Sequence, residues 1–120
     1  MDIKEFVQQR REAFIAMRRD FHMYPEPAWL EYRSAAKVAD KLISLGYDVA
    51  LGSEVLDLNS RMGLPSDEVM KAAMDRAIEE GANPELVEKM GYGKTAIVAT
   101  MKFSDDGPVV AFRADMDSND

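Results

Sequence analysis

The chain has 120 residues, of which 47% are hydrophobic and 31% are charged, as is typical of one soluble globular domain. Its formal net charge of −7 at pH 7 disfavours non-specific binding to nucleic acid or to an anionic membrane surface. No cysteine is present, so neither a disulfide nor a thiolate zinc site can form within the chain. Met1–Glu5 is charged and lacks the apolar run of a secretory signal, and no apolar stretch is long enough to span a bilayer. We therefore expect a soluble, cytoplasmic protein.

Helical spacing of apolar residues predicts two helices at the start of the chain. The first begins after the candidate N-cap Asp2 and runs through about residue 22. Tyr24–Pro27 contains two prolines, which forbid a continued helix. A second apolar stripe begins between residues 28 and 34, and Gly46 fits the position that ends this helix.

The next segments predict a strand followed by an insertion. Tyr47–Leu51 alternates apolar and polar residues and is rich in strand-forming types. Ser66 is a plausible N-cap for a helix over residues 67–80, and Asn83-Pro84 is typical of the start of a short helix through about Met90. Residues 53–92 are therefore predicted to form a helical insertion between two strands.

Two further strands are predicted after the insertion. Thr95–Phe103 is apolar and β-branched, and it is the strongest strand pattern in the chain. The tight connection Ser104–Pro108 leads into Val109–Arg113, so the pair is predicted to be an antiparallel β-hairpin. The predicted fold class is α/β, in the order helix, helix, strand, inserted helices and β-hairpin.

Two carboxylates follow the last predicted strand. Asp115 and Asp117 are separated by one residue, so on an extended chain their side chains point to the same face. Two carboxylates on one face repel unless a cation or a shared proton compensates, which favours a divalent-metal or acid/base role. The alternatives are a solvated acidic loop or caps of a following helix. Arg113 alternates onto the same face and could simply neutralise the pair.

Two generic motifs overlap this segment. Residues 115–120 partly fit a calcium-binding loop, but Asp120 stands where the pattern requires glycine. A strand ending in Asp-x-Asp is also typical of haloacid-dehalogenase phosphotransferases, in which the first aspartate, here Asp115, is the nucleophile. That motif normally opens its fold, whereas here it lies near the end of the chain.

Several segments together carry a family resemblance. They are Arg18–Glu26, Glu31–Ala36, Leu45–Tyr47 and Ala111–Asp117. Taken together, they resemble the start of the co-catalytic metallo-amidohydrolases, which include aminoacylases, hippurate hydrolases and indoleacetyl-amino-acid hydrolases. Within that family, the inserted segment resembles the p-aminobenzoyl-glutamate hydrolase branch, in particular its A-type chains, through Gly52–Val55, Ser60–Pro65 and the helix pair joined at Gly81-Ala82. The match covers essentially the whole chain but well under half of the family's chain.

The resemblance implies both a fold and an activity. Residues 1–120 are expected to be a single partial catalytic domain, the N-terminal part of a zinc-exopeptidase-like domain, with a helical insertion at about 53–92. The implied reaction is hydrolysis of an amide bond to an amino acid in a p-aminobenzoyl-glutamate-like substrate. Two divalent metal ions, zinc or manganese, are the implied cofactors, which activate water and stabilise the oxyanion. A homo-oligomer or a second hydrolase subunit is the implied partner.

The resemblance also assigns roles to the two aspartates. In many relatives the strand ends in His-x-Asp, in which the histidine binds a metal and the aspartate orients it. Asp115 stands in the place of that histidine, near the expected metal site, and Asp117 stands in the place of the catalytic aspartate. The main ligands belong to a later His-x-Cys-Gly-His-Asp segment, a glutamate pair and two further histidines, all absent from residues 1–120. We therefore expect this chain to be inactive alone. The alternative is a stand-alone α/β interaction or oligomerisation module without catalysis.

Overall fold

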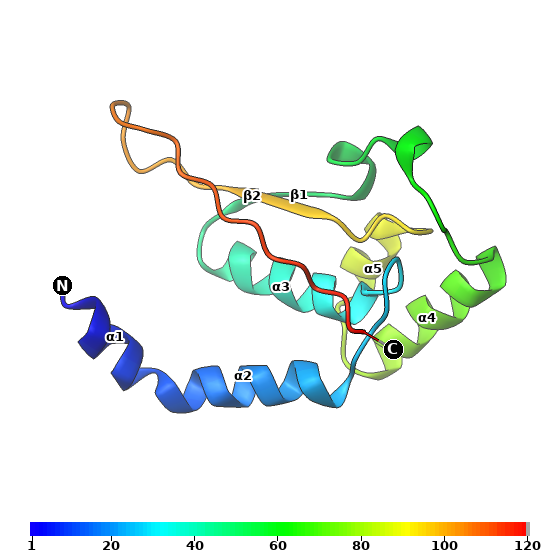
Figure 1. Cartoon of the computed structure of the whole chain (residues 1–120), viewed down its shortest axis with the longest axis horizontal. Coiled ribbons are helices and arrows are strands. Elements are labelled where there is room, and N and C mark those ends of the chain that lie inside the picture. Colours follow the sequence, from blue (N-terminus) through cyan, green and yellow to red (C-terminus); the bar gives the residue numbers. More distant parts are fainter. Residues whose placement is uncertain (120) are drawn as a thin grey trace.

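The computed structural model describes residues 1–119, which form five α-helices, two short 3-10 helices and two strands. In chain order these elements are α1 (Ile3–Gln9), α2 (Arg11–Met23), α3 (Tyr32–Ser44), β1 (Asp48–Leu51), η1 (Gly52–Glu54), η2 (Leu58–Ser60), α4 (Asp67–Glu79), α5 (Pro84–Met90) and β2 (Ile97–Thr100). Figure 1 shows α3 at the centre beside the two strands, with α4 and α5 at one end and α1 and α2 forming an arm. Asp120 and the calcium-loop position it would fill lie outside the described residues.

Local capping signals predict most helix starts correctly. The side chains of Asp2, Ser66 and Asn83 each accept a hydrogen bond from a backbone N–H in the first turn of the helix that follows. Gly46 ends α3 with a φ of +88°, a conformation that glycine adopts without strain. Within residues 1–119, every helix is too short or too polar to span a lipid bilayer.

The prediction of one continuous helix through residue 22 is wrong, because the helix is interrupted at Arg10. This residue has φ −105° and ψ 7°, and it separates α1 from α2. Its guanidinium carbon lies 3.6 Å from the centre of the Phe6 ring, and its Nη1 donates to the Phe6 carbonyl oxygen at 3.3 Å. The Arg10 backbone N–H donates instead to Val7, three residues back, at 3.1 Å. The Arg10 side chain thus bonds to the Phe6 carbonyl oxygen, which in a continuous helix would accept a hydrogen bond from the Arg10 backbone N–H.

The sheet pairs two strands that are distant in sequence. β1 and β2 run antiparallel, with a register from Asp48 opposite Thr100 to Leu51 opposite Ile97. The strand predicted over Thr95–Phe103 is therefore confirmed in its central part only. The predicted hairpin with Val109–Arg113 is wrong, because β2 takes β1 as its partner and residues 101–119 contain no strand.

The end of the chain follows a different path from the one that the predicted hairpin requires. After the turn at Gly107, the tail runs back toward the segment between α2 and α3 (Figure 1). There the Ser118 N–H donates to the Glu26 carbonyl oxygen at 2.8 Å, and Met116 packs against the core. The tail thus ends in contact with the segment between α2 and α3 and not in a strand paired with β2.

The core lies where α3 meets the two inserted helices. Its buried members are Tyr32, Ala35, Ala36, Ala73, Ala77, Ala82, Val87 and Met90. The small alanine side chains let the backbones of α3 and α4 approach closely, while Tyr32 and Met90 fill the remaining space. The Tyr32 hydroxyl accepts a hydrogen bond from the Gly93 N–H at 2.9 Å, which links α3 to the turn before β2.

Arg33 joins α2 to this core. Its side chain is buried and makes a bidentate pair with Asp20 of α2, at 2.8 and 3.1 Å. Its Nε donates to the Glu80 carbonyl oxygen at the end of α4, and its guanidinium lies over the Tyr24 ring at 4.0 Å. Hydrogen bonding from Arg33 lowers the pKa of Asp20. Since α1 and α2 contain no buried residue, this pair is an important contact between the arm and α3.

We predict that Arg33→Ala lowers the free energy of unfolding by about 2–3 kcal/mol, because it leaves the Glu80 carbonyl without its donor and breaks a half-buried, bidentate ion pair with Asp20. The matched control is Arg113→Ala, which removes an ion pair of equal length between two exposed side chains. The control is expected to change stability by less than about 0.5 kcal/mol. Urea denaturation measures both variants, and equal effects would contradict the role assigned to Arg33.

The burial of the Tyr32 hydroxyl predicts that the protein loses stability at alkaline pH. Burial raises the pKa of its hydroxyl above the ordinary value of 10.0, so the unfolded chain releases this proton at lower pH than the native state. The stabilisation is fully present below pH 10.0 and is lost as pH rises through the native pKa. Tyr32→Phe should remove the part of the loss of stability above pH 10.0 that is due to the titration of Tyr32. At neutral pH it should cost about 1–3 kcal/mol, because the buried Gly93 N–H loses its acceptor. Urea denaturation at neutral pH and above pH 10 tests this, and an unchanged alkaline loss in the variant would refute it.

Candidate functional site

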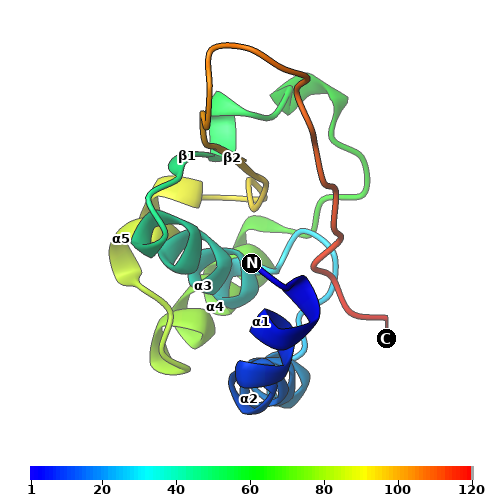
Figure 2. The same cartoon turned by 90° about the vertical axis from the view of Figure 1, so that its left-hand side faces the viewer.

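The tail after β2 carries the two aspartates predicted to act at the site. Residues 101–119 are irregular and largely exposed, and Figure 2 shows the tail passing on the side of the molecule away from α5. Asp115 and Asp117 lie near its end, shortly before the hydrogen bond that joins Ser118 to Glu26. The structure thus places both residues beside the segment that connects α2 and α3.

A pocket of about 470 Å³ lies between the tail, this connecting segment and the start of β2. Its lining residues are Ala28, Trp29, Glu31, Thr95, Ala96, Ile97, Arg113, Ala114, Asp115, Met116 and Asp117. Its volume falls within the usual range for ligand pockets, roughly 300–1,000 Å³. Both predicted site residues line this one pocket.

The charges on the tail are only partly compensated. Arg113 Nη2 donates to Asp115 Oδ1 at 2.8 Å, so the neutralising role considered for this arginine is realised for Asp115. Both side chains are largely exposed, 88% for Arg113 and 67% for Asp115, and such a pair contributes little to stability. Within residues 1–119, Asp117 forms no ion pair. The carboxylate predicted to be catalytic therefore remains available for other contacts.

Glu31 is a third carboxylate of the pocket, and the sequence reasoning did not assign it a chemical role. Its Oε2 accepts a hydrogen bond from Thr95 Oγ1 at 2.7 Å, which joins the start of α3 to the segment before β2. The only signal for it was its place in Glu31–Ala36, one of the segments that carry the family resemblance. Within residues 1–119, no three His, Cys, Asp or Glu side chains converge as metal ligands. The residues present therefore do not form a metal site by themselves.

Glu26 fixes the end of the tail, and sequence reasoning missed this residue as well. Its side chain is only 1% exposed and accepts three hydrogen bonds at the start of α3, from the Arg33 N–H (2.9 Å), the Ser34 N–H (2.7 Å) and Ser34 Oγ (2.7 Å). These bonds satisfy N–H groups that a helix leaves free at its N-terminus. Since the Glu26 carbonyl oxygen holds Ser118, the cap of α3 also positions the residue next to Asp117.

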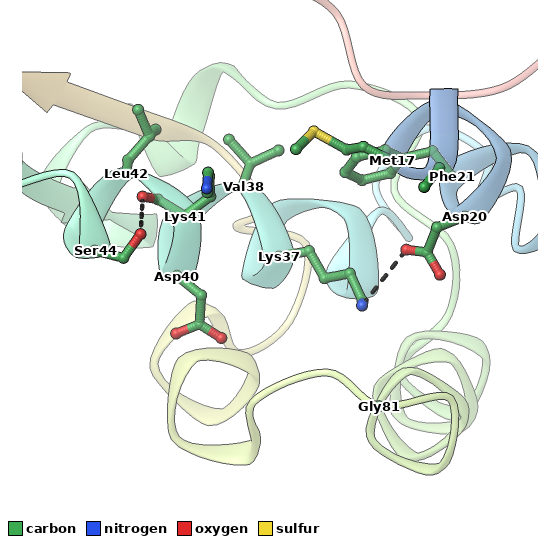
Figure 3. A pocket seen from close by; sticks show the side chains of 11 residues that line it. Met17, Asp20, Phe21, Lys37, Val38, Asp40, Lys41, Leu42, Ser44 and Gly81 are labelled. Atoms are coloured by element: carbon green, nitrogen blue, oxygen red, sulfur yellow. Dashed lines mark hydrogen bonds and ion pairs between the residues drawn. The ribbon is translucent and has the colours of Figure 1, made fainter. Parts of the chain in front are cut away.

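A second hollow, of about 700 Å³, lies between α2 and α3 (Figure 3). Met17 and Phe21 of α2 line it together with Val38 of α3, so its walls are largely apolar. Lys37 and Asp20 lie across it as an ion pair at 3.4 Å. Neither predicted aspartate lines this groove, so the smaller pocket is the candidate site.

The comparisons with known proteins agree with the family resemblance. No protein-family model matches the chain. Over 98% of its length the chain is 42% identical to indole-3-acetyl-aspartic acid hydrolase of Enterobacter agglomerans, and at the same identity to the A-type chain of p-aminobenzoyl-glutamate hydrolase from Escherichia coli K12. The crystal structure of the aminobenzoyl-glutamate utilization protein from Klebsiella pneumoniae matches the whole chain, with a TM-score of 0.95 and 43% identity.

The chain spans 27% of the length of each of these two hydrolases and 30% of the solved chain. The predicted resemblance to the p-aminobenzoyl-glutamate hydrolases is therefore confirmed, as is the α/β fold class. The similarity is to a part of each relative.

We predict that Glu26→Ala lowers the free energy of unfolding by about 2–3 kcal/mol, because the buried N–H groups of Arg33 and Ser34 lose their acceptor. It should also speed hydrogen exchange of the Ser118 amide, since the carbonyl that holds it is no longer fixed. Glu26→Gln retains one acceptor oxygen, so its free energy of unfolding and its Ser118 exchange rate should lie between those of the unmodified protein and of Glu26→Ala. Exchange measured by NMR tests this, with the Gly93 amide as the control for an intact core. Unchanged exchange at Ser118 in Glu26→Ala would contradict the positioning role.

Proposed function

We propose that this chain is the N-terminal part of the catalytic domain of a metal-dependent amidohydrolase. The observation that carries the proposal is the meeting of Asp115 and Asp117 at one pocket, in a chain 42% identical over nearly its whole length to two hydrolases. The reaction is hydrolysis of an amide bond to an amino acid. We place the complete protein in the cytoplasm, acting on a small-molecule substrate.

The substrate class follows from the names of the relatives. Indole-3-acetyl-aspartic acid and p-aminobenzoyl-glutamate are both amides that join a ring-bearing acyl group to an acidic amino acid. We propose a p-aminobenzoyl-glutamate-like substrate of the same kind for the complete protein. The Escherichia coli relative is named as one subunit of its hydrolase, which supports a second hydrolase subunit, or a second copy of the chain, as a partner.

We assign Asp117 the catalytic role and place Asp115 near the metals. In this proposal Asp117 accepts a hydrogen bond from a metal-binding group and holds it in orientation, which is the usual task of a carboxylate behind a metal ligand. Two divalent ions, zinc or manganese, supply water activation and oxyanion stabilisation when bound. Because the carboxylates of residues 1–119 do not converge as a ligand set, the main ligands come from other parts of the complete protein, and we expect this chain to be inactive alone.

A chimera tests these roles. This chain replaces the matching 118 residues of the Enterobacter agglomerans hydrolase, and metal-dependent release of aspartate from indole-3-acetyl-aspartic acid is measured. Asp117→Asn should lower turnover about 10- to 100-fold, the usual effect of losing a carboxylate that orients a metal ligand. Asp105→Asn, an exposed aspartate of the same tail outside the pocket, is the matched control and should leave turnover unchanged. Full activity of Asp117→Asn would refute its role. Turnover by the unmodified chain alone would refute the proposal that the main metal ligands come from other parts of the complete protein.

One observation favours the alternative of an interaction module. Val109 and Phe112 of the tail are 98% and 97% exposed, and exposed apolar side chains close together in the chain favour association. If the chain acts by association alone, sedimentation should show a dimer that Val109→Ser with Phe112→Ser dissociates. Calorimetry should then show no zinc or manganese binding that depends on Asp115 and Asp117.

A further inference from the structure

Trp29 has a backbone conformation that is unusual for a large side chain. Its φ is +68°, and it is the single residue other than glycine with a positive φ within residues 1–119. It lies in the turn from Pro27 to Leu30, which is closed by a hydrogen bond from the Leu30 N–H to the Pro27 carbonyl oxygen at 3.0 Å. Glycine or asparagine normally occupies a turn position with positive φ, because a bulky residue there is strained. Strain of this kind persists where the surroundings hold the residue in place, and it is concentrated at functional sites.

The inserted segment holds the Trp29 side chain. Trp29 Nε1 donates to the Met62 carbonyl oxygen at 2.9 Å, across 33 residues of sequence. The neighbouring Arg61 donates through Nη1 to the carbonyl oxygens of Tyr92 and Gly93, at 2.9 and 3.1 Å. The Gly93 N–H in turn donates to the buried Tyr32 hydroxyl. These hydrogen bonds, together with the peptide link between Arg61 and Met62, connect the core to the indole.

The loop that carries Met62 packs closely on the turn before β2. A Cβ atom added at Gly93 would lie 2.5 Å from Leu64 Cδ2, the end of a side chain that would have to shift, and 3.3 Å from the Met70 sulfur, which is a tight contact. The φ of +61° at Gly93 also favours glycine at this position. The loop that supplies the Met62 carbonyl is thus in close contact with the turn before β2.

Trp29 lines the same pocket as the two predicted site residues. The other apolar members of that pocket are Ala28, Ala96, Ile97, Ala114 and Met116, while Asp115 and Asp117 lie on its tail side. The one polar group of the indole is already bonded to Met62, so what remains of the side chain is apolar ring surface. Such a surface favours a flat ring over an aliphatic chain of similar size, through stacked or edge-to-face contact.

We propose that Trp29 is a specificity-determining residue that contacts the aromatic acyl group of the amide substrate, and that the insertion sets its position through Met62. This inference rests on the proposed function, since it places the ring of the substrate in the pocket that Asp117 lines. It assigns a task to the inserted segment: the insertion shapes the acyl side of the site without contacting the reacting bond.

The test uses the 120-residue chain labelled with ¹⁵N, in which Trp29 is the only tryptophan and so gives the only indole N–H signal. The probes are p-aminobenzoyl-glutamate and N-acetyl-glutamate, which differ in the ring, and no metal is added. We expect p-aminobenzoyl-glutamate to shift the Trp29 indole signal and to bind about tenfold more tightly than N-acetyl-glutamate. Trp29→Leu should abolish this preference, whereas Trp29→Phe, which retains a ring, should keep most of it. Phe103→Leu, an exposed aromatic residue outside the pocket, is the matched control and should keep all of it.

Several results would overturn the proposal. They are equal affinity for the two probes, no binding of either probe, shifts confined to the groove between α2 and α3, or an unchanged preference in Trp29→Leu. If Trp29→Leu does not fold, the indole shift in the unmodified chain and the Trp29→Phe comparison still decide the question. Since no metal or turnover is involved, an inactive chimera combined with an intact ring preference would count against the proposed function alone.

Discussion

The rest of the structure depends on the hydrogen bonds and the ion pair that the buried guanidinium of Arg33 forms. A charge removed from water must be paired and fully hydrogen-bonded, or the fold is strongly destabilised. Arg33 meets this requirement only when three separate parts of the chain are in place: Asp20 of α2, the Glu80 carbonyl at the end of α4, and the Tyr24 ring between helices. The arm of α1 and α2 contains no buried residue, and this pair is one of the contacts that join it to α3.

The same end of α3 also organises the candidate site. The backbone N–H groups of Arg33 and Ser34 point at the Glu26 carboxylate, whose negative charge is favourable at a helix N-terminus. The carbonyl of Glu26 then holds Ser118, next to Asp117. A single helix start thus joins the core to the predicted catalytic residue. The position of the tail depends on this cap, because the tail itself belongs to no strand.

The insertion reaches the site from the other side. Its loop contacts the turn before β2 through Arg61 and holds Trp29 through the Met62 carbonyl. Glu31, at the start of α3, bonds to Thr95 just before β2, and both residues line the pocket. The pocket is therefore built by segments that are far apart in sequence. The 0.95 TM-score against the solved relative shows that this arrangement also occurs within a longer chain.

The sequence alone determined what depends on local contacts. Caps such as Ser66 and Asn83 act within one helical turn, so the starts of α4 and α5 could be predicted from the sequence. Asp115 and Asp117 are separated by one residue, so the sequence also predicted that they lie together, and both line one pocket. Only the tertiary structure decided the rest. The pairing of β2 with β1 replaced the hairpin because strand partners are chosen by long-range packing rather than by proximity along the chain. The roles of Glu26, Arg33 and Trp29 remained hidden for the same reason: each of these side chains acts through partners that only the folded chain brings within hydrogen-bonding distance.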